Sequence, residues 1–147
     1  MFEFDDNYFM AEAYKEAKKA YLKDEVPVGA VLVHNQKIIA RAHNHVEQLL
    51  DVTAHAEILC IGSGSHHLGS KYLNECAIYI TLEPCAMCAT ALGWSQIAKI
   101  VFACRDVKKG FMSLAPQVIH PRTEIVTGVM QESCEKLIKD FFAGKRN

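Results

Sequence analysis

Two short stretches of the sequence gather side chains that can bind a metal and move protons. One is Thr53-Ala-His-Ala-Glu57, and the other is Pro84-Cys-Ala-Met-Cys88. Cys85 and Cys88 are three residues apart, so on a helix they share one face. At a helix N-terminus the dipole stabilises thiolates. Two thiolates and one imidazole suit Zn²⁺, and three protein ligands leave a fourth position open, as in catalytic zinc sites.

Glu57 supplies a carboxylate beside this donor set. It follows His55 by two residues, which is about 200° around an ideal helix. The two side chains therefore converge only if the site lies beyond the N-terminal end of their helix. We expect two helix N-termini to point at one metal, with Glu57 near the reacting water but not ligating the ion.

Other interpretations of the cysteines remain open. A redox pair explains Cys85 and Cys88 but leaves His55 and Glu57 without a role. A structural zinc needs a fourth ligand, and the nearest candidate, Cys60, lies deeper along the same helix. The cysteines outside the pair stand in apolar or helical surroundings, so we expect them to be buried as small hydrophobic side chains; they are Cys60, Cys76, Cys104 and Cys134.

The elements that position these residues follow from hydrophobic periodicity and turn signals. Helices are predicted at about 7–23, 53–62, 84–94 and 132–142. Strands are predicted at 28–33, 37–42, 76–81 and 99–104, with a candidate fifth at 123–128, and the first two are expected to form a hairpin that turns at His34-Asn35-Gln36. Thr53 is a candidate N-cap, and Pro84 suits a first helical turn. Gly62, Gly64 and Gly69 indicate a loose connection, which would place His66 and His67 on a surface loop. Such alternation predicts a mixed sheet covered by helices, with the active site at strand ends.

The length and composition are those of one ordinary domain. The chain has 147 residues, half of them hydrophobic and 22% charged, without repeat or linker, so we expect a single domain over 1–147. No apolar run approaches the roughly 18 residues of a membrane span. The start of the chain is acidic, unlike a signal peptide. We therefore expect a cytoplasmic protein without membrane contact, in which the six cysteines stay reduced.

Charge is unevenly distributed. The net charge is −1, which argues against a strong binder of nucleic acid. However, residues 1–104 hold 8 basic and 12 acidic side chains, whereas residues 105–147 hold 8 and 5. Basic residues of the second part include Arg105, Lys108, Lys109, Arg122, Lys145 and Arg146. This region is either a contact for a polyanion or a solvated surface.

The two clusters form the pattern H-x-E…P-C-x-x-C, the signature of zinc deaminases. The similarity extends along almost the whole chain: VPVGAVLV, TAHAEI, YITLEPCAMCATAL, KIVFACRD and DFF resemble the bacterial tRNA-specific adenosine deaminases, in the same order. The resemblance implies a three-layer α/β/α fold, a homodimer and a cytidine-deaminase-like zinc site. It also implies hydrolytic deamination of adenosine to inosine at the wobble position of a tRNA anticodon.

The resemblance also implies roles for single residues. One zinc per chain would be held by His55, Cys85 and Cys88, and Glu57 would shuttle protons. The flipped base would meet Asn44, Val28 and the backbone at Ala54. The anticodon loop would contact residues of the second part of the chain, namely Asp106, Lys108, Phe142, Lys145 and Arg146.

Two segments depart from the family pattern. His120-Pro121-Arg122 stands where the family usually has Asn-His-Arg, and Gly110-Phe-Met-Ser113 is bulkier than the family's small-residue turn. These differences leave the zinc ligands untouched and bear on the substrate. Two further functions stay open: a zinc deaminase of a free nucleobase or nucleoside, such as guanine or cytosine, and a zinc-stabilised RNA-binding module. Glu57 argues against the module, because a structural zinc site has no use for that carboxylate.

Overall fold

A five-stranded mixed sheet forms the centre of the computed structural model, which describes residues 3–145. The strand order is β2-β1-β3-β4-β5. β1 is antiparallel to both of its neighbours, whereas β3, β4 and β5 run parallel. The strands are β1 (Gly29–His34), β2 (Lys37–His43), β3 (Cys76–Leu82), β4 (Lys99–Cys104) and β5 (Glu124–Thr127). The mixed sheet and its fifth strand are thereby confirmed.

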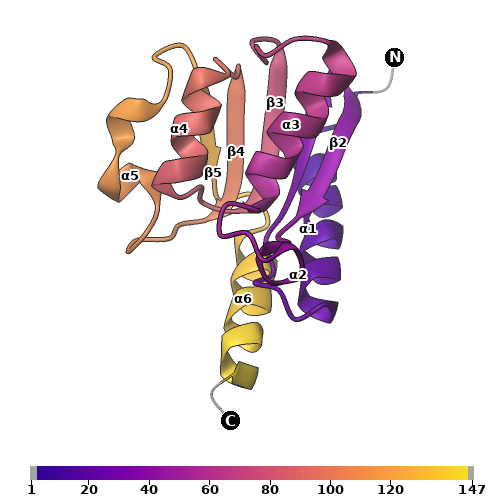
Figure 1. The fold of residues 1–147 in the computed structure, drawn as a ribbon, viewed down its shortest axis with the longest axis vertical. Coiled ribbons are helices and arrows are strands. Elements are labelled where there is room, and N and C mark those ends of the chain that lie inside the picture. Colours follow the sequence, from indigo (N-terminus) through magenta and orange to yellow (C-terminus); the bar gives the residue numbers. More distant parts are fainter. Residues whose placement is uncertain (1–2, 146–147) are drawn as a thin grey trace.

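Helices cover both faces of this sheet, which gives the three layers expected from the sequence (Figure 1). One face carries α3 (Ala56–Leu68), α4 (Ala86–Trp94) and the short α5 (Phe111–Leu114). The other carries α1 (Asp6–Leu22) and α6 (Gln131–Lys145), which contact each other. Two further short helices are α2 (Val46–Leu49) and the 3₁₀ turn η1 (Pro116–Val118). Within the described residues, none of the helices has the length and apolar character to cross a bilayer.

The strand residues alternate between two hydrophobic clusters, as the pleat of a strand requires. Ala30 and Leu32 of β1 pack toward α3 and α4, in a cluster that also holds Cys60. Val31 and Val33 pack toward α1 and α6. Burial on both faces explains why these strands are almost continuously apolar.

The β1–β2 hairpin is confirmed. Asn35 and Gln36 join its strands, with φ of 51° and 63°. Two central residues with positive φ are the pattern of the tight turns that suit the twist of paired strands.

The prediction for the start and end of α3 was wrong. The helix begins at Ala56 with His55 as N-cap, while the Thr53 hydroxyl donates to Asp51 in the preceding turn. Gly62 and Gly64 lie within the helix, which ends at Gly69 with φ of 66°. The glycines do not break the helix, because it is held by packing: a Cβ on Gly64 would lie 2.1 Å from Leu32 Cδ2.

His66 and His67 therefore occupy the last turn of α3 and not a loop, although both are exposed. Pro84 precedes α4, whose N-cap is Cys85, so it does not belong to the first helical turn. The helices α2, α5 and η1 were not predicted, because segments of three or four residues have no periodicity to detect.

Candidate active site

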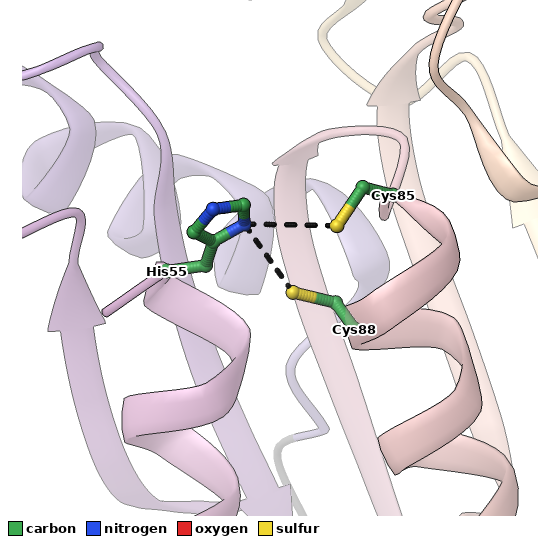
Figure 2. Close-up of side chains that lie close together, drawn as sticks. All are labelled: His55, Cys85 and Cys88. Atoms are coloured by element: carbon green, nitrogen blue, oxygen red, sulfur yellow. Dashed lines mark hydrogen bonds between the residues drawn. The ribbon is translucent and has the colours of Figure 1, made fainter. Parts of the chain in front are cut away.

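Two helix N-termini meet at one point, as the spacing of the motifs predicted. His55 is the N-cap residue of α3, and Cys85 is the N-cap residue of α4. Figure 2 shows the His55 ring from one helix facing the sulfur atoms of Cys85 and Cys88 from the other. The His55 Nδ1 atom lies 3.7 Å from Cys85 Sγ and 3.5 Å from Cys88 Sγ. All three donor atoms lie within 4.8 Å of one another.

This donor set fits zinc. A tetrahedral zinc with ordinary bonds to nitrogen and sulfur would separate those two atoms by about 3.6 Å. The observed separations of 3.5 and 3.7 Å match this value. Two sulfurs and one ring nitrogen also have the mixed softness that zinc prefers.

The contact between the two cysteines favours ionisation of Cys85. The hydrogen bond from Cys88 lowers the pKa of Cys85 to about 4, helped by His55 and opposed by burial. The same contact, and then burial, raises the pKa of the Cys88 thiol. Because the thiolate is the form that binds metals, the pair is prepared for a cation.

Glu57 lies in the first turn of α3, two residues after His55. It is 3% exposed, and burial raises the pKa of its carboxyl to about 7. A carboxyl of this kind gains and loses a proton near neutral pH, as general acid and base chemistry requires.

Cys60 is not part of the donor set. It is fully buried, and its thiol donates to the Ala30 carbonyl at 3.4 Å. Within residues 3–145, the cluster of three potential ligands is His55, Cys85 and Cys88. The predicted burial of Cys76, Cys104 and Cys134 is confirmed.

An open cleft of about 1280 Å³ leads to this site. It lies at the carboxyl ends of the parallel strands β3 and β4, where α/β sheets bind their ligands. The walls come from the α1–β1 connection, the segment around α2, the loop after β4 and the end of α6. The residues of the predicted site that line it are Val28, Asn44, His55, Glu57, Cys85, Asp106, Lys108, Phe142 and Lys145.

One predicted contact lies outside the cleft, and another lies outside the described residues. Ala54 is 2% exposed and does not line the cleft; its N–H donates to Asp51 and its carbonyl accepts from His45. Arg146 lies outside the described residues. Of the neighbouring aromatic residues, Phe141 is buried and Phe142 is 44% exposed.

Asn44 is held in place by the helix that carries His55. Its Oδ1 atom accepts a hydrogen bond from the Ala56 N–H at 2.8 Å, one of the N–H groups that a helix start leaves without an intrahelical partner. This contact also identifies which end of the amide is oxygen. The amide NH₂ is then the group that Asn44 can offer to an acceptor atom in the cleft.

Two buried carboxylates in the cleft walls were not identified from the sequence. Glu25 accepts from the N–H groups of Glu47 and Gln48, at 3.0 and 2.8 Å, and so holds α2. Glu83 accepts three hydrogen bonds from the segment after β4. For Glu83 the sequence offered one signal, which is that an acidic residue stands directly before Pro84-Cys85, at the end of an apolar strand.

The two segments that depart from the family pattern belong to different elements. His120-Pro121-Arg122 forms the turn before β5 and does not line the cleft. Gly110-Phe-Met-Ser113 begins α5, where the bulkier Phe111 is buried against Phe102. The larger side chain thus fills the core behind the cleft.

Comparison with known proteins agrees with this geometry. Residues 4–104 match the family model of the cytidine and deoxycytidylate deaminase zinc-binding region. The tRNA-specific adenosine deaminase of Aquifex aeolicus is 43% identical over 145 residues, covering 95% of each chain. A structure from studies of A-to-I editing by tRNA:A34 deaminases is 37% identical with a TM-score of 0.82, covering 88% of this chain and 98% of that one.

A guanine deaminase from Nitrosomonas europaea has the same fold at 20% identity, with a TM-score of 0.81 over 97% of this chain and 87% of that one. The fold and the His/Cys/Cys site thus define a cytidine-deaminase-like enzyme of the zinc deaminase class. Within that class, the chain belongs to the family of the tRNA-specific adenosine deaminases.

Proposed function

We propose that this enzyme deaminates adenosine to inosine at the wobble position of a tRNA anticodon. The observation that carries the proposal is the 43% identity to a tRNA-specific adenosine deaminase over 95% of both chains. The 37% identical structure from work on tRNA:A34 deaminases supports the same substrate. The fold alone would not, because a guanine deaminase shares it.

One zinc ion would be held by His55, Cys85 and Cys88. The distances from His55 Nδ1 to the two sulfur atoms are those that a tetrahedral zinc requires. Bound zinc supplies Lewis acidity, which makes hydroxide available from water near neutral pH. The buried Glu57 would take a proton from the attacking water. It would pass this proton to the purine ring nitrogen as the water oxygen bonds to C6. It would then carry the remaining proton of that oxygen to the amino group, which leaves C6 as ammonia, so that a C6 carbonyl remains.

The adenine base would enter between Val28 and Asn44. The Val28 side chain supplies an apolar wall, and the Asn44 NH₂ supplies a donor for a base acceptor. A role for the Ala54 backbone would require its carbonyl to accept a second hydrogen bond, since His45 already donates to it.

The size of the cleft and the exposed basic side chains in two of its walls support a polynucleotide substrate. Its volume of about 1280 Å³ exceeds the roughly 300–1,000 Å³ of small-molecule pockets. Exposed basic side chains line the wall after β4, and Lys145 lines the opposite wall with Phe142. We propose that Asp106, Lys108, Phe142, Lys145 and Arg146 contact the anticodon loop. Unstacking a base costs less in a loop than in a duplex.

We further propose that residues 1–147 act as one domain in a cytoplasmic homodimer. The six cysteines, all within residues 3–145, form no disulfide, which is typical of a reducing compartment. Large apolar side chains are exposed at several points, and where they adjoin one another they would form the kind of patch that marks an interface; they include Leu50 at 91%, Val52 at 81%, Trp94 at 78% and Leu114 at 59%.

The test is a deamination assay of the zinc-loaded protein. One arm uses an anticodon stem-loop with adenosine at the wobble position, and the other uses free adenine, adenosine, guanine, cytosine and cytidine. Glu57→Gln is measured beside the wild type. We expect inosine in the stem-loop only, with zinc retained in Glu57→Gln and its turnover reduced by about 10²-fold or more, because the proton carrier is lost.

If a free base is deaminated and the stem-loop is not, the substrate is a small molecule and the proposed RNA substrate is wrong. The proposed zinc chemistry would still hold. Normal turnover in Glu57→Gln would remove Glu57 from the mechanism. His55→Ala is a second control, since it should lose zinc as well as activity.

A further inference from the structure

A buried carboxylate that the reaction does not use lies two residues before a zinc ligand. Glu83 follows β3 directly, and its side chain is 0% exposed. Both carboxylate oxygens accept hydrogen bonds. Oε1 accepts from Arg105 Nε at 2.7 Å and from the Asp106 N–H at 2.9 Å, and Oε2 accepts from the Met112 N–H at 2.9 Å.

All three donors belong to one segment, residues 105–112, which consists of the loop after β4 and the first two residues of α5; it is called the 105–112 loop below. Additional contacts tie this loop to the two residues that follow Glu83. The Phe111 N–H donates to the Pro84 carbonyl at 2.9 Å, and Cys85 and Gly110 form an isolated β-bridge. The loop also approaches Glu83 closely. A Cβ on Gly110 would lie 2.2 Å from the Glu83 carboxylate, so only glycine fits there.

The outer side of this loop faces the cleft. Its consecutive side chains, Arg105, Asp106, Val107, Lys108 and Lys109, all line the cavity. Arg105 is 43% exposed although its Nε is paired with the fully buried Glu83. The segment from Glu83 to Cys85 therefore anchors the loop at one end and carries a metal ligand at the other.

We infer that Glu83 is a positioning residue, whose carboxylate fixes the 105–112 loop relative to Cys85. In this way the charged side chains of the loop meet the substrate at a set distance from the metal. The substrate named here, RNA, rests on the proposed function, whereas the anchoring of the loop does not.

A carboxylate is required because both oxygens must accept. In Glu83→Gln the side chain keeps its size but has one oxygen and one NH₂, which cannot accept. The NH₂ must face either the Met112 N–H or the pair from Arg105 and Asp106, so one side of the anchor is lost. A buried group left without its partner is costly, and more so when the partner was charged.

The experiment compares zinc-loaded wild type, Glu83→Gln and Gly110→Ala. Gly110→Ala disturbs the same contact from the loop side. Tyr79→Phe is the matched control, because it removes a part-buried hydrogen bond to Asp6 on the opposite face of the sheet. Zinc per chain, hydrogen exchange of the loop amides, trypsin cleavage after Lys108 and Lys109, and stem-loop binding and kinetics are measured for each.

We expect one zinc per chain in every protein. In Glu83→Gln, exchange of either the Asp106 or the Met112 amide should rise about tenfold or more, and in Gly110→Ala both should rise. Cleavage of the loop should rise in both variants. The Kd and KM for the stem-loop should rise several-fold, with kcat changing less than KM. Tyr79→Phe should leave the loop and the stem-loop affinity unchanged.

Unchanged loop exchange in Glu83→Gln overturns the inference. So does loss of zinc together with faster exchange along the whole chain, because Glu83 would then support the fold in general. Faster loop exchange with unaltered stem-loop binding overturns the substrate-positioning role. If the wild type neither binds nor deaminates the stem-loop, the proposed function fails, and the exchange data still decide whether Glu83 anchors the loop.

Discussion

Among single residues, the two ends of the Asn44 amide have different roles, one in the fold and one toward the substrate. Its oxygen accepts from the Ala56 N–H, and its NH₂ is the donor offered to the cleft. Asn44→Asp keeps the oxygen and removes the NH₂, so stability and zinc content should persist while kcat/KM falls about tenfold or more. Asn44→Ala should lose activity and also about 1 kcal/mol of stability, because the helix start loses its partner.

Thermal unfolding, zinc analysis and the stem-loop assay separate these two effects. Asn74→Asp is a matched control, since Asn74 is exposed. Equal destabilisation by Asn44→Asp and Asn44→Ala would contradict the division of roles.

His43 is a second residue whose chemistry follows from its neighbours. It is 4% exposed, its Nδ1 lies 3.1 Å from the Asn44 carbonyl, and its Nε2 lies 3.4 Å from Lys23 Nζ. These partners assign the neutral ring with the proton on Nδ1. Burial, together with the charges of His45 and Lys23, lowers the pKa of His43, against the opposing effects of the Asn44 carbonyl and Glu16.

A lowered folded-state pKa has a definite sign for stability. As pH falls through about 6.5, the unfolded chain takes up a proton at this position before the folded protein does, so folding is weakened. Chemical denaturation between pH 7.5 and 5.5 should therefore show a smaller loss of stability in His43→Gln than in the wild type. His67→Gln, at an exposed position, should keep the wild-type slope. A His43→Gln slope equal to that of the wild type would exclude this role for His43.

Among the elements, the contact of α1 with β1 depends on Gly29. A Cβ there would lie 2.2 Å from the Ala13 carbonyl oxygen and 2.4 Å from the Ala17 nitrogen, both backbone atoms that cannot rotate away. Gly29→Ala should therefore lower the free energy of unfolding by about 1–3 kcal/mol. Gly62 lies within α3 with no atom within 4 Å of an added Cβ, so Gly62→Ala should stabilise by about 0.5–1 kcal/mol. Urea denaturation of both variants is the measurement, and the same sign for both would refute the close-packing argument.

For the whole molecule, the metal site and the core are separate. The donor set lies at one end of the sheet, while two hydrophobic clusters hold the layers together. Removing zinc with a chelator should abolish deamination, leave the far-UV circular dichroism largely unchanged and be reversed by added zinc. Unfolding on metal removal would instead indicate a zinc-stabilised module.

The sequence by itself determined the parts of this protein that depend on local spacing. His55, Cys85 and Cys88 stand at the starts of their helices, so the meeting of two helix N-termini followed from the motifs. The strands followed from apolar runs and the hairpin from its turn residues, because both signals lie within a few residues of the chain.

Only the tertiary structure decided which backbone groups the buried carboxylates hold. The contacts of Glu83 span 22 to 29 residues, and those of Glu25 span 22 and 23. Their partners are mostly backbone N–H groups, which every residue except proline has, so no side-chain pattern marks them. The length of α3 was decided in the same way, since packing against β1 outweighs the low helix propensity of Gly62 and Gly64. A local pattern predicts what one segment can do, whereas its neighbours in space determine which of those possibilities has the lowest free energy.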